Sequence, residues 1–225
     1  MSTTPYSLIR SKRKTLALQI KDGEVFVRAP LKLPKFEIDR FVSSKERWIT
    51  DKLAQSKDRL GQRKAFGLTY GKTILLRGRE HTITAKEGKE PEFDGSIIYM
   101  PPGLSPEEIK DACRRLYRRL AKSHIIKRVE DISCHMGVTP SAIKITNART
   151  RWGSCSSKKS INFSWMLIMT DDDTIDYVVV HELAHIIEMN HSERFWAIVE
   201  GVLPDYRRRK AGLKKLHRRL AAEDW

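Results

Sequence analysis

The motif His181-Glu182-Leu183-Ala184-His185 constrains this chain more than any other stretch of it. Residues four positions apart lie on one face of a helix, so His181 and His185 can offer two imidazoles to one metal ion. Glu182 lies beside the first histidine, where its carboxylate can take a proton from an attacking water. Apolar residues flank the motif on both sides, which favours a helix packed in a core over two histidines on a surface helix.

A catalytic zinc site usually has three protein ligands and one open position. His191 follows the motif closely, and we expect Asn190 to turn the chain in the left-handed conformation that ends many helices. Ser192 would then cap a following helix. Glu200 on that helix is the alternative third ligand. The three-histidine spacing equals that of the metzincins, but their glycine and Met-turn are absent, so we reject membership of that group.

Composition limits the remaining possibilities. The net charge of +15 favours polyanionic partners such as nucleic acid, nucleotides or an anionic membrane, although a merely soluble basic surface also explains it. Three scattered cysteines are too few for a disulfide framework. The first twenty residues contain no continuous apolar segment, and no run is long enough to span a membrane. We therefore expect a cytoplasmic protein without a membrane partner.

The first hundred residues predict a strand-rich unit with one long helix. Asp22-Gly23 is a strong hairpin signal between two alternating strands. The expected strands cover 15–20, 25–28, 73–76, 81–85 and 97–100, and the expected helix covers 34–60. Pro101-Pro102-Gly103 is the best candidate linker. The predicted domains are therefore an N-terminal region at 1–102 and a catalytic domain at 103–225.

The second half predicts a helix from 105 to about 136, then strands at 142–147 and 161–169 that pair around a loop at 156–160. An edge strand near the metal could bind an extended peptide by strand addition. Arg151 and Asn162 are then candidates to hold substrate or polarise a carbonyl, and turn stabilisation is their alternative role. We interpret Cys155 as a buried structural thiol, because a metal site and a glutamate already supply the chemistry.

Two groups of arginines are candidates for polyanion binding. Arg114 and Arg118 form a like-charge pair one helical turn apart, which needs either solvent or an anionic partner. Arg207, Arg208 and Arg209 open a basic C-terminal helix. That helix either binds a polyanion or is a solvent-exposed helix with one apolar face packed in the core.

Three segments, RWGSCSSKKSINFSWMLI, IDYVVVHELAHIIEMNHSERFW and LPDYRRRK, resemble the YgjP-like family of metal-dependent hydrolases. The front, IRSKRKTLALQIKDGEVFVRAP, resembles the N-terminal region of that family. More distantly, the core is similar to SprT-like and WLM-type zinc peptidases, which act on proteins bound to DNA. The resemblance implies an α+β fold with a zincin-like core, in which a sheet packs against the HExxH helix. It also implies that His181, His185 and His191 hold zinc and that Glu182 is the base.

The sequence thus predicts a zinc-dependent metallopeptidase that cleaves peptide bonds, with Glu182 as general base. Another divalent metal could replace zinc. One alternative is a metal-dependent nucleoside triphosphate pyrophosphatase, since proteins of this kind have been named both ways, but no phosphate-binding glycine loop is visible. The other is a nucleic-acid-binding protein, which could also be a protease acting on DNA-associated proteins.

Overall fold

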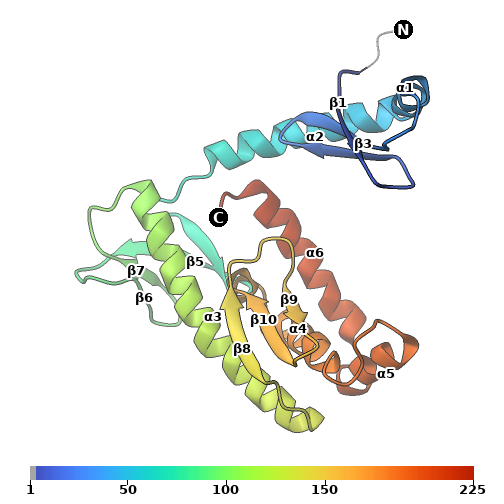
Figure 1. Cartoon of the computed structure of the whole chain (residues 1–225). Helices are drawn as coiled ribbons and strands as arrows, with labels where there is room; N and C mark the ends of the chain where they lie inside the picture. Colours follow the sequence, from blue (N-terminus) through green and yellow to red (C-terminus); the bar gives the residue numbers. More distant parts are fainter. Residues whose placement is uncertain (1–3) are drawn as a thin grey trace. The chain divides into compact units, whose positions relative to one another are not determined.

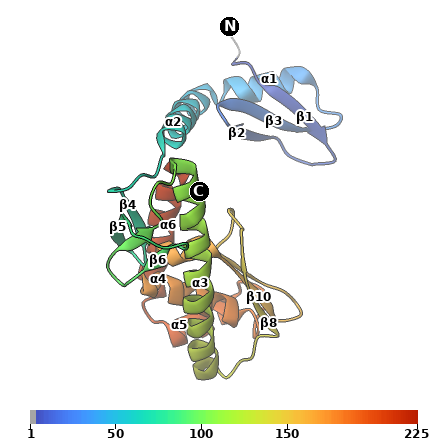
Figure 2. The ribbon, with the colours of Figure 1, turned by 90° about the vertical axis from the view of Figure 1, so that its left-hand side faces the viewer.

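The computed structural model describes residues 4–225, which form two compact units (Figures 1 and 2). The first unit ends at Phe66 and also takes Ala221–Asp224; the second runs from Gly67 to Leu220 and includes Trp225. The fold is mixed α+β, as predicted. No helix within residues 4–225 is both long and apolar enough to cross a membrane.

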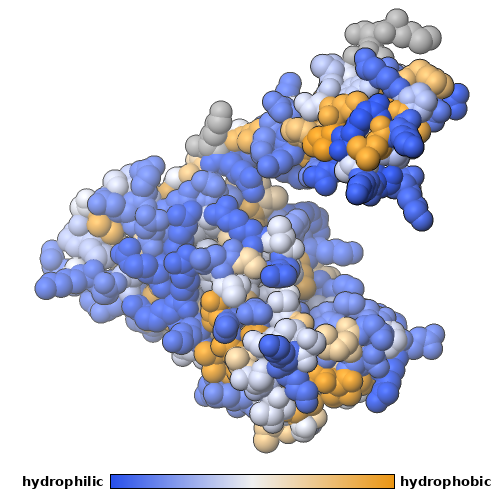
Figure 3. Space-filling model, in the orientation of Figure 1, coloured by the Kyte–Doolittle hydropathy of each residue, from blue (hydrophilic) through white to orange (hydrophobic). Residues whose placement is uncertain are grey.

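The first unit is a three-stranded sheet with two helices. Strand β3 (Glu24–Pro30) pairs antiparallel with β2 (Ala17–Lys21) and parallel with β1 (Ser7–Ser11). The predicted hairpin is confirmed, and its turn residues Asp22 and Gly23 have φ values of 53° and 83°, which a two-residue hairpin turn requires. Strand β1 was not predicted. In Figure 3, hydrophobic side chains gather between hydrophilic ones over this unit.

The long helix expected at 34–60 is two helices, α1 (Lys35–Ser43) and α2 (Glu46–Ala65). The Ser44 hydroxyl donates to the Phe41 carbonyl at 2.7 Å, and this side-chain bond competes with continuation of the helix. Both helices contribute to the core of the unit, which consists of Val25, Val27, Ala29, Ile38, Val42 and Ile49.

In the second unit, the long helix α3 (Pro106–Met136) has one sheet on each side (Figures 1 and 2). Ser105 and Glu108 form a capping box at its start, and Gly137 ends it with a φ of 65°. The first sheet has the order β4-β5-β7-β6, with β4 Thr73–Leu76, β5 Arg79–Ala85, β6 Glu92–Phe93 and β7 Ile98–Met100.

Because of this sheet, the division between the two compact units does not lie at residue 102. Tyr117 of α3 donates its hydroxyl to the Leu75 carbonyl at 2.8 Å, and the Arg77 amide donates to the Ile168 carbonyl at 2.8 Å. Strands β4–β7 therefore pack with the C-terminal half of the chain, and the compact units divide after Phe66.

The second sheet has the order β8-β10-β9, so β9 lies at an edge. Strands β8 (Ala142–Thr146) and β10 (Ser160–Ser164) pair as predicted, but in parallel. The loop at 156–160 joins β10 to β9 (Gly153–Cys155), which pairs antiparallel with β10. The second half of the strand expected at 161–169 is a buried 3-10 helix, η1 (Trp165–Met169), which starts where the Ser164 hydroxyl accepts from the Met166 amide.

Three helices complete the unit: α4 (Asp172–Ala184), α5 (Glu193–Val202) and α6 (Tyr206–Ala222). Asp171 caps α4 by accepting from the Thr174 amide at 2.8 Å, and Ser192 caps α5 by accepting from the Phe195 amide at 3.4 Å. The cap at Ser192 was predicted from the sequence.

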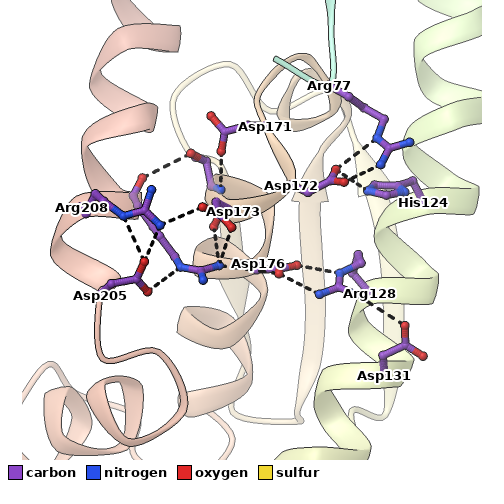
Figure 4. A network of polar contacts seen from close by, with 12 residues as sticks. Arg77, His124, Arg128, Asp131, Asp171, Asp172, Asp173, Asp176, Asp205 and Arg208 are labelled. Carbon is purple, nitrogen blue, oxygen red and sulfur yellow. Dashed lines mark hydrogen bonds and ion pairs between the residues drawn. The ribbon is translucent and has the colours of Figure 1, made fainter. Parts of the chain in front are cut away.

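Charged side chains tie α4 to α3 (Figure 4). Arg128 donates two hydrogen bonds of 2.7 Å to the carboxylate of Asp176, a bidentate geometry that fixes both side chains. Asp172 accepts from His124 at 2.9 Å and pairs with Arg77 from the turn before β5. The Arg77 guanidinium therefore lowers the pKa of the Asp172 carboxyl.

A second set of ion pairs ties α4 to α6 (Figure 4). The side chain of Arg209 is only 16% exposed and lies 3.1 Å from Asp173 and 2.7 Å from Asp205. Arg208 lies 2.9 Å from Asp173 and 2.5 Å from Asp205. The start of α6 is therefore held against the first turn of α4.

Helices α4 and α6 approach closely at Gly212, where an added Cβ would overlap Thr174 Oγ1 and lie 3.2 Å from Thr174 Cβ. Alanine normally stabilises a helix interior by about 1 kcal/mol relative to glycine. Because Thr174 is buried, we expect Gly212→Ala to destabilise the protein by about 1–3 kcal/mol in urea unfolding. Gly201→Ala in α5 is the matched control, since nothing lies within 4 Å there, and it should stabilise slightly. Equal effects of the two changes would contradict this close packing.

Candidate metal centre

The last turn of α4 carries the motif. His181 and Glu182 lie in the helix, and His185 is its C-terminal cap with φ −66° and ψ −16°. After His185 the hydrogen bonding changes to the tighter 3-10 pattern. The Ile186 and Ile187 amides each donate to a carbonyl three residues back.

The turn that returns the chain differs from the prediction at Asn190. Within residues 4–225, the non-glycine residues with positive φ are Asp22, Arg77 and Lys159, so Asn190 is not left-handed. Instead, its side-chain oxygen accepts from the Ser192 amide at 2.9 Å. This side-chain turn leads directly from His191 into α5.

The three histidines converge. One ring nitrogen from each of His181, His185 and His191 lies within 4.8 Å of the other two. The Nε2 atoms of His181 and His191 are 3.1 Å apart. Two nitrogens bound to one tetrahedral zinc would be about 3.3 Å apart. Glu200, the alternative ligand, is exposed and does not belong to this group.

The environments of His181 and His185 favour the neutral imidazole that binds metals. His185 Nδ1 donates to the Glu188 carbonyl at 3.1 Å, which leaves its Nε2 lone pair free for a cation. Burial, with the neighbouring histidines, lowers the pKa of His181 to about 3, and burial also lowers the pKa of His185. The donor set therefore fits a divalent cation of the zinc type.

The apolar ring of Phe195 contacts all three imidazoles. Its buried ring centroid lies 4.9 Å from that of His181, 4.5 Å from that of His185 and 4.8 Å from that of His191. The sequence placed Phe195 only on a helix after the third histidine. Its position four residues beyond His191, on the apolar face of α5, is the signal that could have identified it.

Glu182 is 5% exposed and lies against the edge strand β9. Its burial raises the pKa of the carboxyl to about 7, opposed by the nearby charge of Arg151. A Cβ added to Gly153 would lie 2.5 Å from Glu182 Oε1 and 2.6 Å from its Cγ. Only glycine therefore allows the backbone of β9 to approach this carboxylate, a requirement that the sequence did not reveal.

A cavity of about 180 Å³ opens at the first two residues of the motif, His181 and Glu182. It is lined by Trp152, Gly153, Tyr177, Val178, His181, Glu182 and Leu213. The cavity thus lies between the end of α4, the edge of the β8-β10-β9 sheet and helix α6.

The other predicted site residues lie near β9. Arg151 is exposed, and its charge reaches Glu182. Asn162 donates its amide to Ser154 Oγ at 3.4 Å, across the β10–β9 pair. Burial, followed by the charge of Glu182, raises the pKa of the Cys155 thiol. A raised thiol pKa disfavours a nucleophile and agrees with a structural role.

Most of the arginines predicted to bind polyanions already have partners in the chain. Arg208 and Arg209 pair with the aspartates of α4 and with Asp205. Arg207 donates to the Tyr206 hydroxyl at 3.2 Å, and Arg114 pairs with Asp111 at 2.9 Å. Arg118 is exposed on α3.

Comparison with known proteins shows to which class of proteins this chain belongs. The family model described as YgjP-like, metallopeptidase domain, matches residues 14–216, which is most of the chain. The protein is therefore a metal-dependent hydrolase. It belongs to the YgjP-like family, as the sequence segments indicated.

Other comparisons are more distant. No curated protein matches the chain. Among solved structures, the metallopeptidase zymogens abylysin of Pyrococcus abyssi and jannalysin of Methanocaldococcus jannaschii are each 21% identical, with TM-scores of 0.35 and 0.34. Each match covers 43% of this chain, and 90% and 92% of the two relatives respectively.

The contact between Gly153 and Glu182 yields a prediction. Gly153→Ala would displace the Glu182 carboxylate without touching the histidines, so we expect hydrolytic activity to fall by about 100-fold, the lower range for loss of a positioned general base. Metal content, measured by mass spectrometry of the purified variant, should stay at the wild-type level. Gly67→Ala, which meets nothing within 4 Å, is the control and should remain active. An active Gly153→Ala enzyme would show that β9 does not position the carboxylate.

Proposed function

We propose that this chain is a zinc-dependent peptidase in which His181, His185 and His191 hold the metal and Glu182 is the general base. The convergence of three ring nitrogens beside one buried carboxylate carries the proposal. The core would be zincin-like, with the β8-β10-β9 sheet packed against α4. All proposed catalytic residues lie within the predicted domain at 103–225, with strands β4–β7 packed onto it.

When bound, a divalent cation supplies Lewis acidity to the substrate carbonyl and lowers the pKa of the attacking water. Glu182 takes the proton of that water at a carboxylate oxygen and delivers it to the nitrogen of the leaving amine. The burial that raises its pKa to about 7 suits a group that accepts and releases a proton near neutral pH. Phe195 keeps bulk water from the back of the imidazoles.

Strand β9 offers a place for the substrate. It pairs with β10 on one side only, so its other edge presents backbone donors and acceptors to an extended peptide. We propose that Arg151, whose charge reaches the cavity, contacts the substrate carbonyl. The hydrogen bond from Asn162 to Ser154 supports a role in bracing β9 rather than a direct contact.

The family assignment supports the peptidase proposal over the two alternatives, a nucleoside triphosphate pyrophosphatase and a nucleic-acid-binding protein. The family is described by its metallopeptidase domain, which favours a peptide or protein substrate over a nucleoside triphosphate. The ion pairs of Arg208 and Arg209 also remove two of the cations that motivated a nucleic-acid partner.

Metal analysis beside activity tests the assignment. Alanine at His181, His185 or His191 should each abolish stoichiometric zinc, because two imidazoles hold the cation far less tightly than three. Glu182→Gln should keep zinc but lower kcat on unfolded protein substrates by about 1000-fold, the middle of the range for lost general-base catalysis.

Two further variants serve as controls in this experiment. His135→Ala changes an exposed histidine of α3 and should retain both metal and activity. Glu200→Ala should also retain zinc; loss of zinc there, with retention in His191→Ala, would replace the third ligand. Full activity in Glu182→Gln would rule out the proposed base.

A further inference from the structure

The catalytic cavity continues into a second, larger one along α6. This second cavity has a volume of about 470 Å³ and is lined by Trp152, Leu213, Lys214, His217 and Arg218. Trp152 and Leu213 line both cavities, so the two are adjacent on the same face of the second unit. A substrate that extends from the first cavity into the second would lie beside the basic residues of α6.

These basic residues differ from the other cations of the helix. Arg208 and Arg209 pair with aspartates, and Arg219 on the far side pairs with Glu80. By contrast, within residues 4–225 no carboxylate pairs with Lys214, His217 or Arg218, all of which are exposed. Three cations that face α4 and β5, Arg208, Arg209 and Arg219, thus have carboxylate partners, whereas Lys214 and Arg218 of the groove have none among the described residues.

The available cations form a stripe that begins at the metal centre. Lys210 lies over the Trp196 ring, with Nζ 5.1 Å from its centroid, and its charge contributes to the environment of His181. Lys214 and Arg218 follow at intervals of four residues, which places them on the same helix face. Arg218 is oriented by a 3.3 Å hydrogen bond from its Nε to the Lys214 carbonyl.

The dimensions of the stripe suit a peptide. Eight residues of helix rise by about 12 Å from Lys210 to Arg218. An extended peptide covers that length with about three to four residues. An anionic group two to four residues from the scissile bond would therefore lie beside Lys214 and Arg218.

We propose that this groove is a substrate subsite for a peptide carboxylate, supplied by an aspartate or glutamate side chain or by the chain end. The inference rests on the proposed peptidase function. The Trp152 and Leu213 side chains would pack against the apolar part of that residue, and Lys214 with Arg218 would bind its carboxylate. The enzyme then selects acidic sequence on one side of the cleaved bond.

Quenched fluorescent peptides test the subsite. A neutral peptide with an amidated end, whose cleaved bond is identified by mass spectrometry, is compared with versions that carry Glu or Gln at each position within four residues of that bond. We expect about tenfold higher kcat/KM for Glu over Gln at one or two positions on one side only, weakened by 0.5 M NaCl. A further peptide with a free carboxyl end distinguishes a terminal carboxylate from a side-chain carboxylate.

Charge reversal assigns the preference to these residues. Lys214→Glu with Arg218→Glu should abolish the preference for Glu and favour Lys at the same position, while the neutral peptide is still cleaved. Lys214→Gln with Arg218→Gln should abolish the preference without inversion, and it serves if the reversed variant does not fold. Lys215→Glu is the matched control, because Lys215 is an exposed lysine of α6 that lines a different cavity beside Glu80. It should keep the wild-type preference.

Binding to Glu182→Gln separates this inference from the peptidase proposal. A labelled Glu peptide should bind that variant about tenfold more tightly than its Gln partner, as fluorescence anisotropy would measure. This result without any cleavage by the wild-type protein would reject the peptidase and leave the subsite standing. The subsite is rejected if Glu and Gln peptides behave alike, or if the double variants keep the preference. It is also rejected if inorganic triphosphate competes for the groove while acidic peptides do not, since that result would indicate a phosphate site.

Discussion

The packing of strand β9 against helix α4 is the contact on which the rest of the centre depends. Gly153 brings the backbone of an edge strand against the side chain of Glu182, and no larger residue fits between them. The same contact buries the carboxylate and raises its pKa. It also leaves the free edge of the strand beside the cavity at His181. One close approach thus positions the proposed base, adjusts its proton affinity and places a surface for an extended substrate next to it.

That contact needs a fixed α4, and the aspartates of the helix provide it. Asp172 and Asp176 bind groups on α3, and Asp173 binds Arg209 of α6, so the amino-terminal half of α4 is held from two sides. Carboxylates at a helix start also interact favourably with the helix dipole. In the part of the chain that the structure describes, the carboxy-terminal half makes no ion pair to α3 or α6, and it carries the imidazoles against the apolar ring of Phe195. Structural charge and candidate chemistry occupy opposite ends of one helix.

The sequence predicted the parts of the centre that are local in the chain and missed those that are not. The spacing of His181 and His185, the cap at Ser192 and the hairpin at Asp22-Gly23 all follow from rules that span a few residues. The requirement for Gly153 depends on a residue 29 positions away in the sequence, and no periodicity records it. The apolar run at 161–169 was assigned wholly to a strand, because short buried helices and strands have the same composition. The sequence also does not reveal that Leu75 meets Tyr117, the contact that joins strands β4–β7 to the C-terminal half of the chain.

The ion pairs in the fold change the interpretation of the net positive charge of the chain. A count of arginines treats α6 as a uniform arm for polyanions, whereas the fold pairs some of its cations with carboxylates of α4 and β5 and places others in a stripe beside the candidate metal centre. A divalent cation held by the three proposed imidazole ligands would receive no negative charge from them, and Lys210 would add to its positive potential. Such a potential weakens the binding of the cation itself, yet it favours negative charge that develops on a substrate carbonyl and any anionic group that accompanies the substrate. The proposed selection of an acidic substrate would therefore be a physical consequence of the same field that would assist the reaction.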